Sequence, residues 1–116
     1  MVLDHFDNWV VQLRKGIVEL CILNALQGRE WYGYELVKRL VQVPGLHVVE
    51  GTIYPLLSRL RVQGLLRASL RESREGPARK YYALTAKGER VLAQMNDHLE
   101  LLTTGIDRIR GKGASP

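Results

Sequence analysis

The periodicity of apolar residues changes at Gly64, and this change restricts the possible folds more than any other feature of the chain. The segment before it carries apolar residues at the three-and-four spacing of one helix face: Ile53, Leu56, Leu57 and Leu60. After it, Leu66, Ala68 and Leu70 alternate with polar residues, as in a strand with one buried face. A helix followed at once by strands predicts a mostly helical domain of the α+β class.

The segment before Gly64, residues 51–63, is interpreted as a DNA-reading helix. Its side opposite the apolar face carries Thr52, Pro55, Arg59 and Val62, with Tyr54, Ser58 and Arg61 alongside. We expect Thr52 to cap the helix and Pro55 to lie in the first turn, where its missing N–H has no intrahelical partner. Gly64 should end the helix. Taken alone, the same pattern also describes an ordinary amphipathic core helix with solvated arginines.

A basic hairpin is predicted over residues 66–84. The turn residues fall at 74–78, and residues 79–84 form the returning strand. Helices followed by such a hairpin describe a winged helix, in which Arg74, Arg79 and Lys80 would reach phosphates or the minor groove. A solvated hairpin tip is the alternative.

Charge is concentrated in the same part of the chain. Residues 51–90 hold nine basic and three acidic side chains, whereas the net charge of all 116 residues is +5. This distribution favours a partner with many negative charges, although membrane headgroups would satisfy it as well as DNA. The length fits one domain, and the hydrophobic fraction of 46% is ordinary for a folded protein.

The residues upstream supply the rest of a helix-turn-helix. Apolar periodicity predicts a first helix over about 9–27, in which Asn24 is expected to form an internal hydrogen bond, with a ligand contact as the alternative. Residues 28–33 resemble a turn with two aromatic residues. A short helix over about 34–41 and the Pro-Gly loop 43–50 then lead to the helix at 51–63.

The last predicted helix, residues 86–110, follows Thr85 as its N-cap. Its apolar residues recur at spacings of 3, 4, 3, 4 and 3: Leu92, Met95, Leu99, Leu102, Ile106 and Ile109. A heptad seam of this kind suits a partner helix, so we expect dimerisation, with packing on the chain's own first helix as the alternative. The predicted organisation is a DNA-binding region at 1–85, the dimerisation helix at 86–110 and a tail at 111–116, within one structural domain.

The sequence gives little support for an enzyme. Cys21 is the only cysteine and sits in an apolar run, so we interpret it as a core residue, with a redox-sensing thiol as the alternative. The histidines are scattered, and we find no nucleophile and base pair, no metal cluster and no glycine-rich phosphate loop. We expect neither cofactor nor metal. No apolar run approaches a membrane span and the first residues are acidic, so we expect a cytoplasmic protein without a membrane partner.

Three stretches of the sequence resemble the PadR family of bacterial transcriptional regulators. They are residues 32–36 (Tyr-Gly-Tyr-Glu-Leu), residues 51–60 with Gly64-Leu65-Leu66, and residues 76–85 with Gly88. The match spans roughly residues 13–100. The single long C-terminal helix resembles the short subfamily, whose members dimerise through that helix and the first one.

The resemblance implies a homodimeric repressor that binds an inverted repeat in a promoter near its own gene. It implies DNA contacts from the second and third helices at Tyr34, Thr52, Tyr54, Ser58 and Arg59, and from the wing at Gly76, Arg79 and Lys80. Several short members bind flat aromatic drugs at the dimer interface. This chain lacks the corresponding aromatic residues, and Leu20, Asn24, Met95 and Leu99 would line a smaller or aliphatic effector pocket.

One function from a different class remains open at this stage. A winged-helix module with a basic face can also bind an acidic protein partner. Such a module would show no preference for promoter DNA over a random duplex, which distinguishes it from a transcriptional regulator.

Overall fold

The computed structural model describes residues 4–112, which form four helices and three strands. In chain order these are α1 (His5–Ala25), β1 (Trp31–Tyr32), α2 (Gly33–Val41), α3 (Glu50–Val62), β2 (Leu66–Ser73), β3 (Gly76–Leu84) and α4 (Ala86–Ile109). The strands form one antiparallel sheet in the order β1-β3-β2. This is the mostly helical α+β architecture that the sequence predicts.

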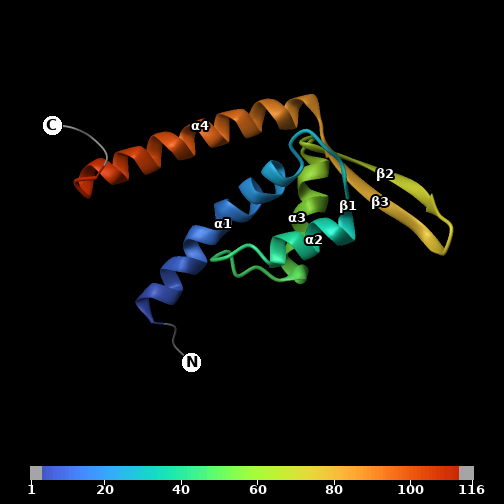
Figure 1. The fold of residues 1–116 in the computed structure, drawn as a ribbon, viewed down its shortest axis with the longest axis horizontal. Helices are drawn as coiled ribbons and strands as arrows, with labels where there is room; N and C mark the ends of the chain where they lie inside the picture. The colour runs from blue at the N-terminus through green and yellow to red at the C-terminus, as the bar shows by residue number, and fades with distance from the viewer. Residues whose placement is uncertain (1–3, 113–116) are drawn as a thin grey trace.

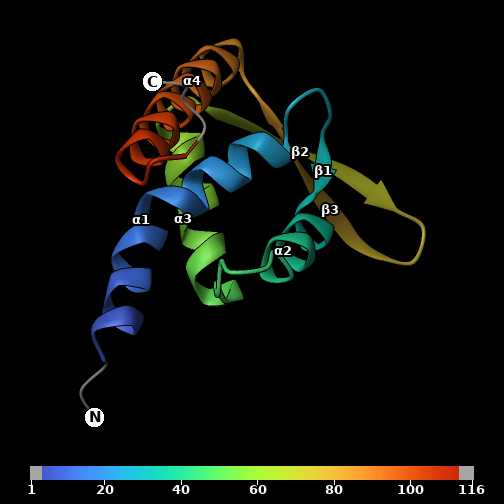
Figure 2. The ribbon, with the colours of Figure 1, turned by 60° about the vertical axis from the view of Figure 1, so that its left-hand side comes forward.

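The elements form an elongated molecule of 59 × 40 × 22 Å. Helices α1, α2 and α3 make a central body, from which the β2–β3 hairpin projects on one side and α4 extends on the other (Figure 1). After the view is turned, the hairpin still stands clear of the helices (Figure 2). The two features that the sequence assigns to DNA and to a partner chain therefore point away from each other.

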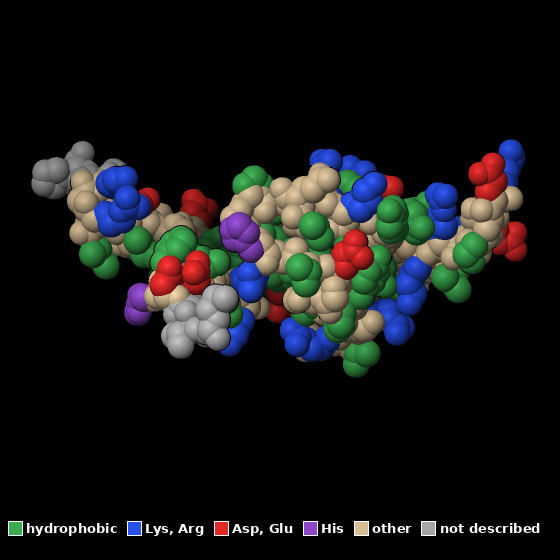
Figure 3. All heavy atoms as spheres, turned by 90° about the horizontal axis from the view of Figure 1, so that it is seen from below, with side chains coloured by type: hydrophobic (Ala, Val, Ile, Leu, Met, Phe, Trp, Pro, Cys, Tyr) green, Lys and Arg blue, Asp and Glu red, His purple; other side chains and the backbone are tan. Residues whose placement is uncertain are grey.

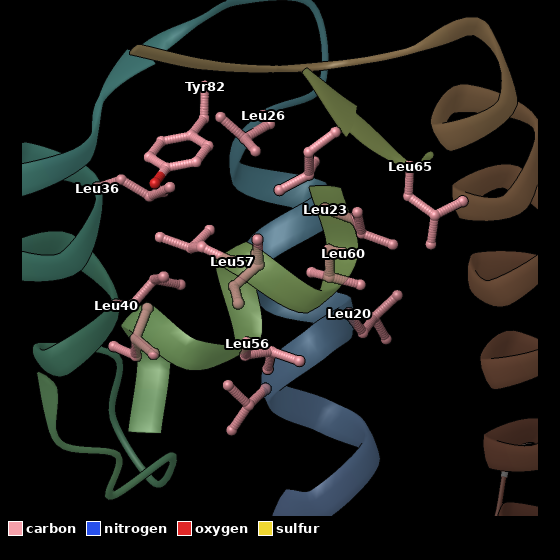
Figure 4. Packing of buried hydrophobic residues seen from close by; sticks show 14 of the residues in the cluster. Leu20, Leu23, Leu26, Leu36, Leu40, Leu56, Leu57, Leu60, Leu65 and Tyr82 are labelled. Atoms are coloured by element: carbon pink, nitrogen blue, oxygen red, sulfur yellow. The ribbon is translucent and has the colours of Figure 1, made fainter. Parts of the chain in front are cut away.

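The central body is held together by a single apolar cluster around α3. Ile53, Leu57 and Leu60 of α3 are completely buried. Residues of α1, α2 and the sheet surround them, and among those labelled in Figure 4 are Leu23, Leu26, Leu36, Leu40 and Tyr82. The inner face of α3 is therefore the centre of the fold.

Helix α3 begins earlier than the sequence suggests. Its N-cap is Val49, which is extended and offers no side-chain hydrogen bond, and Thr52 already lies inside the helix. The prediction of Thr52 as the cap was wrong. The chain is extended at Val49 and becomes helical at Glu50, so the first helical turn begins before Thr52. The Glu50 carboxylate lies favourably at the positive end of the helix dipole. Pro55 consequently lies inside the helix instead of in its first turn, which removes one backbone hydrogen bond there.

Helix α1 also begins before its predicted start. Asp4 caps it by accepting a hydrogen bond from the backbone N–H of Asp7 (2.7 Å). Further along, the Asn24 amide donates to the carbonyl oxygen of Leu20 (3.0 Å), and Asn24 and Asn96 exchange two hydrogen bonds (3.1 and 2.9 Å). The expected internal hydrogen bond of Asn24 is confirmed, and it fastens α1 to α4. Cys21 is half-buried against the core.

The sheet contains a strand that the sequence does not reveal. Trp31 and Tyr32, interpreted above as part of a turn, pair with Tyr82 and Tyr81 of β3. Leu70 departs from expectation in the opposite sense, because its side chain is 69% exposed rather than buried. Both differences depend on tertiary structure. Strand β1 needs a partner about fifty residues away in the chain, and Leu70 lies in the outer half of the hairpin, which extends beyond the helices that would cover it (Figure 1).

Helix α4 begins and ends close to its predicted limits. Thr85 is its N-cap, as predicted, and accepts a hydrogen bond from the backbone N–H of Gly88 (2.9 Å). Leu92 is buried in the chain's own core, and Met95 and Leu99 pack against that core, whereas Leu102, Ile106 and Ile109 are exposed. The first residues of the heptad seam are therefore part of the core, and its last three residues are exposed to solvent. Of the predicted tail, residues 113–116 lie outside the described residues.

Leu57→Ala should lower the free energy of unfolding by about 2–5 kcal/mol, because it removes a fully buried side chain from the centre of the core. Val62→Ala on the same helix is the matched control, since Val62 is 81% exposed. It should change stability by less than about 1 kcal/mol, with alanine slightly favoured by helix propensity. Urea unfolding followed by circular dichroism measures both. Equal losses in the two variants would contradict this account of the core.

Candidate nucleic-acid interface

A groove of about 600 Å³ separates the wing from the helices, and most of the predicted DNA-contacting residues line it. The helices contribute Tyr34 at the start of α2, and Tyr54 and Ser58 on α3. The hairpin contributes Gly76, Arg79 and Lys80. These residues come from three separate parts of the sequence, so the fold brings together groups that the sequence could only assign individually.

The remaining predicted residues of α3 lie around a second hollow, of about 550 Å³, between α3 and α1. Thr52, Pro55 and Arg59 face Arg14 and Lys15 of α1 there. The Arg14 guanidinium also donates to the carbonyl oxygen of His47 (2.6 Å), in the loop that precedes α3. The exposed surface of α3 is thus divided between a side facing the wing and a side facing α1.

Gly33 allows α2 to approach the sheet closely enough to form the groove. A Cβ atom at this position would lie 2.9 Å from the ring of Tyr82 and 3.4 Å from the carbonyl oxygen of Lys80. Real Cβ atoms do not approach neighbours as closely as the first of these distances. The first turn of α2 therefore rests directly on β3, which places Tyr34 at the edge of the groove.

Aromatic rings and cations alternate across the surface that joins the wing to α2. The guanidinium of Arg79 lies over the ring of Tyr32 (4.9 Å), and that of Arg71 over the ring of Tyr81 (4.3 Å). The rings of Tyr32 and Tyr81 are 5.7 Å apart. Such contacts are worth about 0.5–1 kcal/mol each at exposed sites. They hold the two arginines in defined positions while leaving their positive charge at the surface.

Acidic side chains are fewer than basic ones in this part of the molecule and oppose only some of its charge. Arg71 forms an ion pair with Glu30. Arg74 lies near the end of the hairpin, in a small hollow that also contains Glu72 and Glu75. In Figure 3, Lys and Arg side chains continue from the helical body into the projecting hairpin, whose far end carries both acidic and basic groups. Glu75 and Arg79 line both this hollow and the groove, whereas Lys80 lines the groove alone.

Two tyrosines near the groove have raised pKa values. Burial, followed by the neighbouring Glu50 carboxylate, raises the pKa of Tyr54. Burial likewise raises the pKa of Tyr82, although the positive charge of Arg61 opposes the shift. Both phenols stay protonated at neutral pH, so the hydroxyl of Tyr54, an exposed residue that lines the groove, can act as a hydrogen-bond donor as well as an acceptor.

Among the residues around these hollows that were not predicted as site residues are Tyr32, Arg14 and Lys15. Tyr32 lies two residues before the predicted Tyr34 in the sequence. Its position beside the wing depends on the pairing of β1 with β3, which was not predicted. Arg14 and Lys15 form a basic pair in the sequence. Only the packing of α1 against α3 brings that pair next to Arg59.

Residues 4–112 contain no group of three or more His, Cys, Asp or Glu side chains arranged to hold a metal ion. Within the same range, none of the helices combines the length and apolar character needed to cross a bilayer.

The arrangement of α2, α3 and the β2–β3 hairpin defines a winged helix-turn-helix protein. The model of the transcriptional regulator PadR-like family matches residues 22–94. The chain belongs to this family of transcriptional regulators, whose members bind DNA.

Solved structures support the assignment. A PadR-like transcription factor from Bacteroides fragilis shares 39% identity, over 88% of this chain and 98% of that one, with a TM-score of 0.73. A PadR-like regulator from Bacillus cereus shares 37%, over 89% and 99%, with a TM-score of 0.76. A PadR family regulator from Eggerthella lenta shares 32%, over 93% and 94%, with a TM-score of 0.77. The curated proteins offer no match.

The raised pKa of Tyr82 has a consequence for stability at high pH. The unfolded chain releases the phenol proton at a lower pH than the folded chain, so this residue contributes stability below about pH 10 that is lost as the pH rises further. Tyr82→Phe should reduce the fall in unfolding free energy between about pH 8 and pH 11. Urea titrations of both proteins at the two pH values test this. An identical fall in the variant would contradict it.

Proposed function

We propose that the protein is a homodimeric, sequence-specific transcriptional repressor that binds an inverted-repeat operator near its own gene. The observation that carries the proposal is the groove between the wing and the helices, where Tyr34, Tyr54 and Ser58 meet Arg79 and Lys80. Polar side chains on a helix and cations on an adjacent hairpin are the two kinds of group that a DNA duplex requires. Acting on DNA places the protein in the cytoplasm.

In this proposal α3 enters the major groove, where base edges differ in their pattern of hydrogen-bond donors and acceptors. Tyr54, Ser58 and Arg59 supply the base contacts, because all three are exposed on α3. Thr52 and the surface of Pro55 lie against the DNA from the side of α1. The free hydroxyl of Tyr54 and the guanidinium of Arg59 offer complementary chemistry, since the first both donates and accepts hydrogen bonds and the second only donates.

The wing supplies affinity that does not depend on sequence. Arg79 and Lys80 contact phosphates, Gly76 lets the backbone approach the duplex, and Arg74 reaches outward from the tip. Neutralised phosphates release counterions, so this part of the affinity decreases as salt increases. A repressor bound in this way covers a promoter and thereby excludes the transcription machinery.

The homodimer of the proposal forms through α4 and α1. The outer half of α4 carries exposed Leu102, Ile106 and Ile109, the last of them 88% exposed. Helix α1 presents a second exposed stripe, in which Phe6 and Trp9 stack with their ring centroids 6.3 Å apart. Each stripe supplies an apolar face that a second copy can cover, in a two-fold arrangement in which α4 of one protomer lies on α1 of the other. Leu92, at the start of the same seam, is buried in the core and holds α4 on its own protomer.

The small-molecule effector of the proposal binds where α1 and α4 meet. Leu20, Met95 and Leu99 line an open apolar groove of about 440 Å³ there, together with Gly16 and His98. Asn24 lies on the same pair of helices but is already paired with Asn96. The lining favours an apolar ligand, and such a ligand would affect DNA binding by changing how the two protomers pack.

Substitutions on the two sides of the groove should have different effects on DNA binding. Tyr54→Ala or Arg59→Ala should weaken binding to the operator by about 5- to 150-fold with little change on random duplex, because base contacts are lost. Lys80→Ala should weaken binding to every duplex and reduce the salt slope by about 1. Electrophoretic titrations at several salt concentrations measure both, on an operator obtained by selection from random DNA.

Arg108→Ala is the matched control, since Arg108 is exposed on α4, far along the chain from the groove. It should leave both affinities unchanged. Equal and salt-insensitive binding by the wild type and all variants would contradict the proposal. Absence of any preference for selected over random DNA would favour the alternative, an interaction module for an acidic protein.

The dimer is tested with two neighbouring leucines of α4. Leu102→Glu should weaken dimerisation at least about 10-fold, because an unpaired carboxylate would be buried in the seam. Leu101→Glu is the control, since Leu101 is 71% exposed and lies outside the heptad seam. Sedimentation velocity over a range of concentrations gives the oligomeric state. A dimer that tolerates both substitutions equally would exclude the α4 seam as its interface.

A further inference from the structure

The turn that follows the recognition helix α3, residues 63–65, is hydrogen-bonded directly to the start of α4. The Thr85 hydroxyl donates to the carbonyl oxygen of Gly64 (2.6 Å) and the Thr85 backbone N–H to that of Leu65 (3.1 Å). The Lys87 ammonium donates to the carbonyl oxygen of Gln63 (3.0 Å). We call these residues, together with Gly88, the α3–α4 clamp.

The chemistry of the clamp suits the two helix ends that it connects. The last carbonyl groups of a helix have no intrahelical partner and carry partial negative charge, which favours a cation such as Lys87 beside them. The Thr85 hydroxyl serves both segments, because it accepts from the Gly88 N–H at the start of α4 while it donates to the carbonyl oxygen of Gly64 in the turn after α3. One side chain therefore caps α4 and satisfies a carbonyl of the turn that ends α3.

Gly88 makes the connection close as well as hydrogen-bonded. It is buried, and a Cβ atom at this position would collide with the backbone carbonyl of Leu65. The neighbouring atoms are backbone, which cannot move aside as the end of a flexible side chain can. Any other residue at this position would push the start of α4 away from the end of α3.

We propose that Thr85, Lys87 and Gly88 are positioning residues that fix the direction of α3 relative to α4, and thereby set the half-site spacing that the protein accepts. The inference rests on the proposed function, in which α4 forms the dimer and α3 reads DNA. The clamp links the start of α4 to the turn that directly follows α3. The other hydrogen-bonded attachment of α4 within the described residues, between Asn96 and Asn24, fastens it to α1 instead.

The length of α4 makes the half-site spacing sensitive to the angle between α3 and α4 at the clamp. Its 24 residues correspond to about 36 Å of helix. A rotation of about 5° at the clamp displaces the far end of such a helix by about 3 Å, close to the roughly 3.4 Å rise of one base pair. Small angular changes between α3 and α4 are therefore large on the scale that distinguishes one half-site spacing from the next.

The test compares substitutions that remove only the contacts to α3. Thr85→Asp keeps an acceptor for the Gly88 N–H but has no hydroxyl to donate to Gly64, whereas Thr85→Ser keeps both bonds. Lys87→Met removes the ammonium and keeps most of the stem. Arg90→Met removes the same charge from an exposed position of α4, where the side chain forms no hydrogen bond or ion pair with the rest of residues 4–112. Circular dichroism and sedimentation confirm that each variant folds and dimerises.

Binding is measured on operators whose half-sites are separated by successive single base pairs, and on a duplex with one half-site. Thr85→Asp combined with Lys87→Met should reduce the preference for the best spacing over its neighbours by about 2- to 10-fold. Affinity for the single half-site should not change. Thr85→Ser and Arg90→Met should retain the wild-type preference. If the double variant fails to fold, Lys87→Met alone, which leaves the cap of α4 intact, decides the question.

A folded, dimeric clamp variant that keeps the full wild-type spacing preference would overturn the inference and leave the proposed function intact. An equal loss of affinity on all spacings and on the single half-site would also overturn it, because it would show that the clamp only stabilises the fold. A wild-type protein without spacing preference, bound no better to two half-sites than to one, would instead refute the dimeric function itself.

Discussion

Burial of the inner face of α3 is the interaction on which the rest of the structure depends. Ile53, Leu57 and Leu60 lose all contact with solvent between α1, α2 and the sheet. Burying an apolar side chain of this size contributes about 1.5–3 kcal/mol, which no exposed contact of the molecule matches. Because this face must point inward, the polar and cationic residues between its members point outward. The same helix is thus the centre of the core and, in the proposed function, the element that faces DNA.

The surface around α3 is organised by contacts between segments that are distant in the sequence. The short strand β1 ties the start of α2 to β3, and Gly33 permits the close approach. Tyr32 and Arg79 then connect the wing to α2. The wing projects into solvent with few apolar contacts of its own, so these attachments near its base determine where its cations lie relative to α3.

The apolar residues of the molecule fall into a group that is buried in the core of the chain and a group that is exposed on α4 and α1. Leu92 belongs to the core of the chain, whereas the continuation of the same seam at Leu102, Ile106 and Ile109 is exposed. Phe6 and Trp9 are exposed in the same way on α1. The clamp at Thr85 lies at the start of α4, at the opposite end of the helix from its exposed apolar residues. In the inference above, the length of α4 lets a contact of modest energy affect the geometry of the proposed dimer.

Periodicity in the sequence was sufficient to determine the helices, the hairpin, the cap at Thr85 and the outward-facing residues of α3, because these depend on near neighbours in the chain. It could not determine β1 or the exposure of Leu70, which depend on residues tens of positions away and on where the helical body ends. It misplaced the start of α3, because an extended Val49 begins the helix without the capping side chain that was expected of Thr52. The tertiary structure alone decided which outward residues share a groove and how α3 is joined to α4. Those arrangements require packing between segments whose separation in the chain carries no periodic pattern.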